Sequence, residues 1–196
     1  MVKLTPEARA RKIKLLLFDV DGVLTDGKLF FIAVPAELAA RLGSGLTSQS
    51  QIEFKGFHAH DGAAISLARI GGIKTGLITK RKSETVARRA SDLKLDYVYQ
   101  GVNDKRSCFL EIVKKAELEA EEAAFVGDDV IDLPAMRAGG LAVAVKNART
   151  EVKREAHYVT LHAGGEGALR DAVEFILKAQ NKWKGAVAEY IGEPTQ

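Results

Sequence analysis

The chain has one cysteine and no long apolar run, and each of these shortages excludes a class of structure. With Cys108 alone, no disulfide can form within the chain, which fits a reducing compartment such as the cytoplasm. No stretch of 18 apolar residues occurs, so we expect no transmembrane helix. The basic residues 1–14 lead to an acidic residue and not to a small-residue cleavage site, so we expect no signal peptide. The net charge of +3 is too small to indicate a nucleic-acid partner.

What is present is the composition of an ordinary globular protein. The 196 residues are 46% hydrophobic and 28% charged, enough for one well-buried core. We therefore expect a single domain over residues 1–196, with a flexible C-terminal tail over about 184–196. Cys108 lies in a helical pattern, where a small packing residue is expected and not a nucleophile.

Short apolar segments alternate with helical patterns along the chain. Strands are predicted over 13–20, 73–79, 97–99, 123–126, 141–145 and 158–160. Helices are predicted over 61–70, 83–93, 105–116, 133–138 and 167–180. This alternation is typical of the α/β class, and it predicts a Rossmann-like three-layer sandwich with a mostly parallel central sheet and no large cap domain.

One segment departs from the alternation. Residues 28–32 and 51–55 both read as extended, and residues 43–50 between them have the composition of a linker. We expect a projecting β-hairpin over about 28–55 with a long tip over 33–50.

Carboxylates follow two of the apolar strands. Asp19 and Asp21 end the first strand, and Asp128, Asp129 and Asp132 follow the strand over 123–126. Since an unpaired buried charge is costly, such residues are poor choices for packing. Parallel strands bring both groups to one edge of the sheet, where oxygen ligands can hold Mg²⁺. The sequence therefore predicts a magnesium site at this edge.

Two further strand ends carry groups that suit a phosphate. Thr79 ends the strand over 73–79 and supplies a hydroxyl, and Lys105 begins a helix and supplies a cation. Either residue alone would be unremarkable, as a strand threonine or a solvated lysine. Their order relative to the carboxylates raises both as candidates.

Together these motifs resemble the haloacid dehalogenase superfamily of phosphohydrolases. Within it, the wider match is to the capless phosphatase branch typified by 3-deoxy-D-manno-octulosonate 8-phosphate phosphatase, and it extends from about residue 13 to 180. The matching stretches are Asp19–Gly27 (DVDGVLTDG), Asp61-Gly62, Leu77–Ser83 (LITKRKS), Tyr99–Lys105 (YQGVNDK), Gly127–Met136 (GDDVIDLPAM) and Tyr158–Thr160 (YVT).

The resemblance implies a mechanism through an aspartyl-phosphate. Asp19 would attack phosphorus, and Asp21 would protonate the leaving alcohol and then deprotonate water. Mg²⁺ would be held by Asp19, the Asp21 carbonyl and Asp128. Thr79 and Lys105 would stabilise the equatorial oxygens. In support, Asp132 would orient Lys105 or a metal-bound water, and Asp129 would be an outer-shell group or part of a solvated loop.

The resemblance also assigns residues to the substrate. Asp61, Arg81 and Arg89 match positions near the substrate in this branch, although Arg89 could belong to a solvated helix face. His58, His60 and Gly62 are expected to line the same pocket. For the histidine pair, a pocket-lining or interface role is favoured over a second metal.

The substrate that this branch implies is a phosphorylated sugar acid, with 3-deoxy-D-manno-octulosonate 8-phosphate first. The chain departs from the branch at Lys80, Ser66 and Glu166, which leaves N-acylneuraminate 9-phosphate or another small sugar phosphate open. A non-catalytic module that only holds Mg²⁺ or phosphate is the alternative of another class, which the intact Asp19 and Asp21 pair disfavours. Phosphoryl transfer to an acceptor other than water ranks lower, since no cap would exclude water.

The branch further implies a homotetramer in which hairpins cover neighbouring active sites. Four apolar residues of the predicted hairpin would suit such contacts if they are exposed: Phe30, Phe31, Ile52 and Phe54. The alternative is that they pack on their own domain.

Overall fold

The computed structural model describes residues 4–35, 37, 40–41 and 51–193. Its centre is β1 (Leu15–Phe18), four apolar residues that are all buried. A strand buried on both faces is typical of a parallel sheet, and β1 pairs in parallel with β4 (Lys74–Thr79) on one side and β6 (Ala123–Gly127) on the other. The sheet has the order β5-β4-β1-β6-β7-β8, and every pair in it is parallel. The predicted α/β fold with a mostly parallel sheet is confirmed.

The remaining elements follow in the order expected of such a sheet. The other strands of the sheet are β5 (Tyr97–Gln100), β7 (Leu141–Ala144) and β8 (Tyr158–Val159). The helices are α1 (Pro6–Ala10), α3 (Ala59–Ile70), α4 (Glu84–Leu93), α5 (Lys105–Lys115), α6 (Leu133–Ala138), α7 (Thr150–Glu155), α8 (Ala168–Ala179) and α9 (Trp183–Tyr190).

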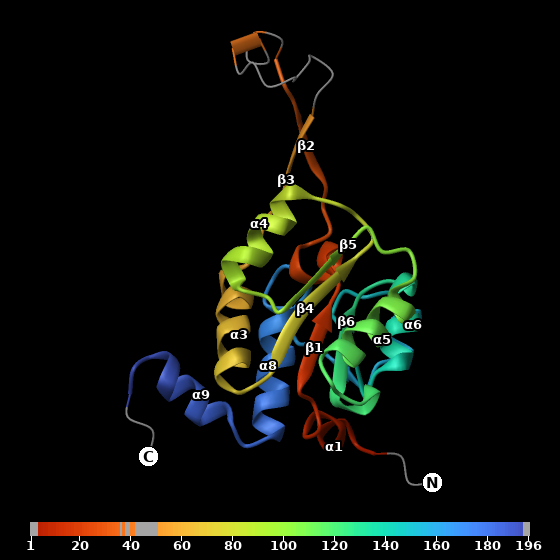
Figure 1. The fold of residues 1–196 in the computed structure, drawn as a ribbon, viewed down its shortest axis with the longest axis vertical. Helices are drawn as coiled ribbons and strands as arrows, with labels where there is room; N and C mark the ends of the chain where they lie inside the picture. The colour runs from red at the N-terminus through yellow and green to blue at the C-terminus, as the bar shows by residue number, and fades with distance from the viewer. Residues whose placement is uncertain (1–3, 36, 38–39, 42–50, 194–196) are drawn as a thin grey trace.

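The helices form two layers around the sheet. In Figure 1, α3 and α8 lie side by side on one face, and α5 and α6 lie on the other. The buried faces of these helices and both faces of the sheet form one continuous apolar core. With the helices in their layers, the carboxyl ends of the strands form an edge from which the strand-to-helix loops emerge.

The predicted hairpin projects from this body (Figure 1). Strands β2 (Phe30–Ala33) and β3 (Gln51–Phe54) pair antiparallel, with Phe30 opposite Phe54. Most of the expected tip over 33–50 lies outside the described residues. The apolar side chains of both strands are exposed, and Phe30 stacks on Phe54 with ring centroids 5.0 Å apart. The hairpin therefore does not pack its apolar residues on its own domain.

The C-terminal segment differs from the expected loose tail. Residues 183–190 form α9, which packs on α3 and buries Ala186. Arg170 of α8 lies over the Trp183 ring, 4.8 Å from its centroid. Residues 183, 186 and 187 are spaced so that they share one face of the helix, and this face packs on the domain. Residues 191–193 follow α9 without regular structure.

The described helices are short in relation to a bilayer. Among the residues that the structure describes, no helix has both the length and the apolar character needed to cross a membrane.

Candidate active site

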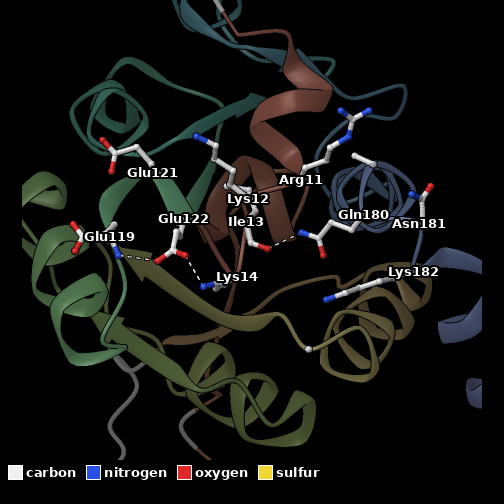
Figure 2. Close-up of a pocket in the computed structure, with 12 residues that line it drawn as sticks. Arg11, Lys12, Ile13, Lys14, Glu119, Glu121, Glu122, Gln180, Asn181 and Lys182 are labelled. Atoms are coloured by element: carbon white, nitrogen blue, oxygen red, sulfur yellow. Dashed lines mark hydrogen bonds and ion pairs between the residues drawn. The ribbon is translucent and has the colours of Figure 1, made fainter.

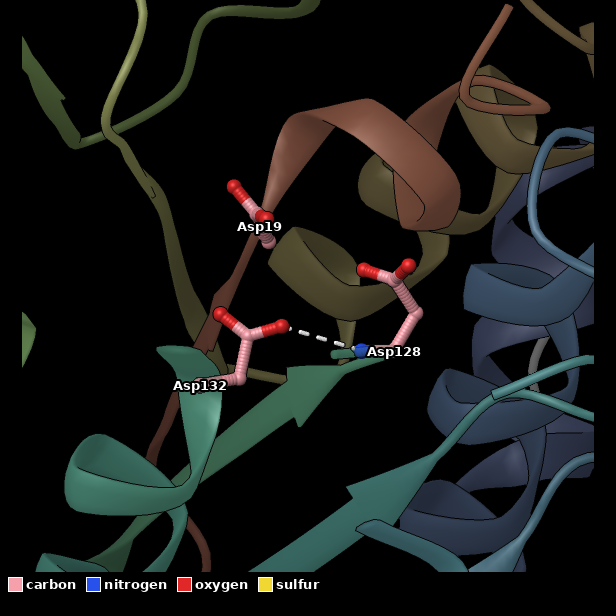
Figure 3. A group of neighbouring side chains, drawn as sticks. All are labelled: Asp19, Asp128 and Asp132. Carbon is pink, nitrogen blue, oxygen red and sulfur yellow. Dashed lines mark hydrogen bonds between the residues drawn. The ribbon is translucent and has the colours of Figure 1, made fainter. Parts of the chain in front are cut away.

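Three acidic side chains converge where the order of the sheet changes direction. Asp19 follows the central strand β1, and Asp128 follows its neighbour β6. Asp132 lies one turn further along the same loop, and Figure 3 shows the three side chains close together beyond the ends of β1 and β6. One oxygen of each lies within 4.8 Å of the others. In open α/β sheets, this crevice between diverging neighbours of the central strand is where ligands bind.

Lys105 supplies the positive charge of this group. It is the first residue of α5, and its side chain is buried between two carboxylates. Its Nζ lies 3.0 Å from Asp19 Oδ2 and 2.6 Å from Asp132 Oδ1. Asp132 was predicted to orient either Lys105 or a metal-bound water, and the contact that the structure contains is the one with Lys105.

Asp132 is fully buried and occupied on both oxygens. Its Oδ2 accepts hydrogen bonds from the backbone N–H groups of Asp128, at 3.0 Å, and Asp129, at 3.3 Å. It therefore connects Lys105 to the loop that carries Asp128. Asp132 is close enough to share a metal with Asp19 and Asp128, but both of its oxygens already have partners within the protein.

Two carboxylate oxygens remain for a metal. Asp19 Oδ1 and Asp128 Oδ1 are buried and have no hydrogen-bond partner among the described residues. A buried carboxylate oxygen without a partner is costly, and a hard cation satisfies it. The predicted ligand set of Asp19, Asp128 and the backbone carbonyl of Asp21 therefore fits the donor atoms that the site offers.

The electrostatics of the protein without metal agree with this reading. Burial, with the nearby charge of Asp132, raises the pKa of Asp19 to about 6 against the opposing effect of Lys105. Burial and the charges of Asp132 and Asp19 raise the pKa of Asp128 to about 7. For Lys105, burial alone would lower the pKa, but Asp19 and Asp132 outweigh it and raise the pKa above its ordinary value. The site thus has more negative charge than Lys105 can stabilise.

Two glycines allow the loops to come this close. Gly22 has a φ of +95°, and a Cβ atom there would lie 2.3 Å from Asp128 Oδ2. A Cβ atom on Gly164 would lie 1.7 Å from the carbonyl oxygen of Gly22. Both positions need glycine for close approach, and together they hold the loop after β1 against the loop before α8.

Thr79 and Asp21 flank the carboxylates. Thr79 is the buried last residue of β4, next to β1 in the sheet. Asp21 lies in the turn after β1 and forms ion pairs with two basic residues. Lys55 Nζ contacts Asp21 Oδ1, and Arg81 Nε lies 3.6 Å from Asp21 Oδ2.

Lys55 and Glu53 are site residues that the sequence prediction missed. Glu53 lies in β3 and Lys55 directly follows this strand, so both are at the base of the hairpin. Glu53 Oε1 accepts a hydrogen bond of 2.6 Å from Arg81 Nη2. The signal in the sequence was two polar residues at i and i+2 between apolar ones, which places them on one face of a strand. Only the third dimension brings that face to Asp21.

The substrate residues predicted around α3 have different surroundings. Asp61 is fully buried, and its Oδ1 accepts a 3.0 Å hydrogen bond from the backbone N–H of Arg170 at the start of α8. Burial raises the pKa of Asp61 despite this bond. Asp61 Oδ1 thus caps the start of α8, whereas Asp61 Oδ2 is buried and has no hydrogen-bond partner among the described residues. The predicted substrate contact of Asp61 stays a prediction.

The remaining members of this group lie nearer the surface. His58 caps α3 by accepting a 3.3 Å hydrogen bond from the backbone N–H of His60, and both rings are in edge-to-face contact. Arg89 of α4 lies over the ring of Phe57 and beside Gly62, where a Cβ atom would be 2.7 Å from Arg89 Nη2. Gly62 thus makes room for Arg89.

A hollow of about 800 Å³ lies at the opposite end of the sheet (Figure 2). Its lining includes residues that precede β1, β4 and β6, so it is at the amino ends of the strands. Three charged groups of this hollow have partners: Lys14 pairs with Glu122 at 2.6 Å, and Lys182 donates to the Gly71 carbonyl at 2.8 Å. Among the described residues, buried polar atoms without a partner occur in the carboxylate cluster and not in the lining of this hollow.

Comparison with known proteins assigns this arrangement to a class. The sequence profile of the haloacid dehalogenase-like hydrolases matches residues 64–170. The chain therefore belongs to the haloacid dehalogenase-like hydrolase family, which confirms the predicted resemblance. Its relatives narrow the class, and the chain is an enzyme of the phosphatase type.

The 3-deoxy-D-manno-octulosonate 8-phosphate phosphatase of Yersinia pestis is 36% identical over 178 residues, covering 91% of this chain and 87% of that enzyme. A crystal structure of the Moraxella catarrhalis phosphatase of the same name, in complex with magnesium ion, phosphate ion and a KDO molecule, superposes with a TM-score of 0.82. It is 33% identical, and the match covers 94% of this chain and 97% of that one. The cobalt-bound Haemophilus influenzae phosphatase has a TM-score of 0.76 at 32% identity, covering 89% and 93%.

Proposed function

We propose that this enzyme is a Mg²⁺-dependent phosphomonoester hydrolase that acts through an aspartyl-phosphate on Asp19. The observation that carries the proposal is the pair of buried carboxylate oxygens without partners, Asp19 Oδ1 and Asp128 Oδ1, beside the buried Lys105. Asp19, Asp128 and the Asp21 carbonyl would hold the ion. When bound, Mg²⁺ supplies positive charge that reduces the repulsion between the Asp19 carboxylate and a phosphate dianion.

The side chains of the protein divide the chemistry between them. Asp19 is the nucleophile, and Lys105 keeps one of its oxygens fixed at 3.0 Å. Asp21 gives a proton to the leaving alcohol and later takes one from the attacking water. Lys105 and Thr79 bind the phosphoryl oxygens, on which charge develops in the transition state. Asp132 keeps Lys105 in place.

The substrate we propose is a phosphorylated sugar acid, first of all 3-deoxy-D-manno-octulosonate 8-phosphate. The names of the relatives support this choice, and Arg81, Arg89, His58 and His60 are the polar residues proposed to meet the sugar acid. N-acylneuraminate 9-phosphate and smaller sugar phosphates are the competing substrates, because Lys80, Ser66 and Glu166 depart from the branch.

We further propose a homotetramer, in the cytoplasm, whose hairpins cover neighbouring active sites. The exposed apolar side chains of β2 and β3 support it, since monomers seldom expose such a patch. The single cysteine agrees with a reducing compartment.

The experiment is phosphate release from a panel of sugar phosphates with Mg²⁺ or with a chelator, for the wild type and Asp19→Asn. Turnover that requires both Mg²⁺ and Asp19 is expected, with the sugar acid as the best substrate. A folded protein that binds Mg²⁺ but releases phosphate from no substrate would instead be a binding module of the same fold.

A further inference from the structure

Four charged residues meet at the base of the hairpin, beside the carboxylate cluster but separate from it. This hairpin-base cluster consists of Asp21, Glu53, Lys55 and Arg81. Its members come from three segments: the turn after β1, strand β3 with the residue that follows it, and the loop after β4. The cluster is balanced, with two carboxylates and two cations, and it joins the hairpin to the loop of Asp21.

Lys55 is the most deeply buried member. Its side chain is only 1% exposed, whereas that of Arg81 is 42% exposed. An ammonium group withdrawn from water in this way is costly unless a carboxylate faces it. The carboxylate that faces Lys55 therefore fixes the position of its ammonium group. The role of Lys55 depends on which carboxylate this is.

Asp21 is the nearer of the two carboxylate partners of Lys55. Lys55 Nζ is in contact with Asp21 Oδ1 but lies 3.6 Å from Glu53 Oε1. Glu53 also accepts a 2.6 Å hydrogen bond from Arg81, so its nearest cation is Arg81, whereas the nearest cation of Asp21 is Lys55.

The contact divides the two oxygens of Asp21. Lys55 holds Oδ1, and Oδ2 lies on the side of Arg81, 3.6 Å from its Nε. The Asp21 side chain remains 21% exposed, so these contacts do not cover it completely. Held by one oxygen, the carboxyl group cannot rotate freely, and the oxygen that exchanges a proton with the substrate has a fixed place.

From this geometry we infer that Lys55 is a positioning residue, which orients Asp21 for proton transfer to the leaving alcohol. The inference rests on the proposed function, in which Asp21 is the acid. The hairpin would then have two roles. Its base positions a catalytic residue, and its strands present an exposed apolar surface. Among the described residues, Lys55 forms ion pairs with Asp21 and, at 3.6 Å, with Glu53, and of these two only Asp21 belongs to the proposed catalytic group.

A pair of substrates with different leaving groups tests this inference. A sugar phosphate has an alkoxide leaving group that needs a proton, whereas 2,4-dinitrophenyl phosphate has one that does not. The quantity to compare is kcat/KM, because it reports the steps up to transfer of the phosphoryl group to Asp19. Lys55→Met is expected to lower kcat/KM for the sugar phosphate by about tenfold or more, and that for the aryl ester by less than about threefold.

Three companions sharpen the result. Lys55→Arg, which keeps the cation, is expected to recover most of the loss. Added to Asp21→Asn, Lys55→Met is expected to cause no further loss, since a residue that acts through Asp21 has nothing left to orient. The matched control is Lys28→Met, which removes another Lys–Asp contact, the exposed 2.8 Å pair with Asp26, and should leave both esters unchanged.

An equal loss on both esters, or no loss on either, would overturn the inference while the proposed function stands. If the wild type hydrolyses neither ester, the proposed function fails and the inference fails with it. If Lys55→Met does not fold, the charge-balanced double variant Glu53→Gln/Lys55→Met replaces it, and the same ratio of the two esters decides.

Discussion

Burial of Asp19 and Asp128 predicts that the protein without metal becomes less stable as the pH rises. Their pKa values are raised to about 6 and about 7, above those of an unfolded chain. A carboxyl group of this kind gives its full stability below the unfolded pKa, near 3.8, and loses it as the pH rises through the folded pKa. We therefore expect the loss between about pH 4 and pH 7.

Asp128→Asn removes one of these charges, and its effect can be estimated. A rise from 3.8 to about 7 corresponds at most to about 4 kcal/mol at pH 7.5, at roughly 1.4 kcal/mol for each pH unit. At pH 5 the same calculation gives about 1.6 kcal/mol. Because Asp19 and Asp128 influence each other, the measured gain will be smaller than this ceiling. Without metal, we expect Asp128→Asn to be more stable than the wild type by about 2 kcal/mol or more at pH 7.5, and by less at pH 5.

The assay is urea unfolding at one protein concentration, at pH 5 and pH 7.5, with a chelator and with saturating Mg²⁺. Mg²⁺ should stabilise the wild type most at pH 7.5 and Asp128→Asn much less. The control is Asp92→Asn, which removes an exposed carboxylate that pairs with Arg88, with an expected change below about 0.5 kcal/mol. If Asp128→Asn is less stable than the wild type in chelator at pH 7.5, or if the difference does not change with pH, the reasoning from burial is refuted.

Three other substitutions test single contacts. Lys105→Met leaves Asp19 and Asp132 without their cation, so we expect it to lower the free energy of unfolding by about 3 kcal/mol or more and to abolish phosphate release; wild-type turnover would contradict its role. Asp61→Asn is expected to cost about 1 kcal/mol in urea unfolding through the start of α8 and to leave KM within about twofold, whereas a large rise in KM would favour substrate contact. Gly22→Ala forces a Cβ atom against Asp128, so calorimetry should show Mg²⁺ binding weakened by about tenfold or more; unchanged affinity would show that the loops can separate.

The sequence was most informative where a buried strand ends in a charge. Continuous apolar runs predicted β1 and β6, and the carboxylates directly after them had no packing reason to be there. Since parallel strands share a carboxyl edge, the convergence of Asp19 and Asp128 followed from two local patterns. Lys105 is the first residue of α5, so predicting where this helix begins was enough to place Lys105 at the same edge.

Prediction was poorer where a role depends on what packs against a residue. The hydrogen bond that Asp61 accepts from the start of α8 joins two helices that are far apart in the chain, so no local pattern could predict it. Lys55 looked like an ordinary polar strand residue, because its contact with Asp21 depends on the direction in which the hairpin leaves the domain. The short α9 has helical spacing, but only its place on α3 shows that it is held.

The carboxylate cluster can also be considered as a count of formal charges. Asp19, Asp128 and Asp132 give three negative charges and Lys105 gives one positive charge, so the ionised group has a net charge of −2. A divalent cation brings the net charge of the cluster to zero. A monovalent cation leaves the cluster with a net negative charge, and a trivalent cation leaves it with a net positive charge. Charge and size, more than the identity of the element, would then govern which ions the site accepts. When a dianionic phosphate ester binds, the net charge of the site returns to −2, and cations from outside the cluster must balance this charge.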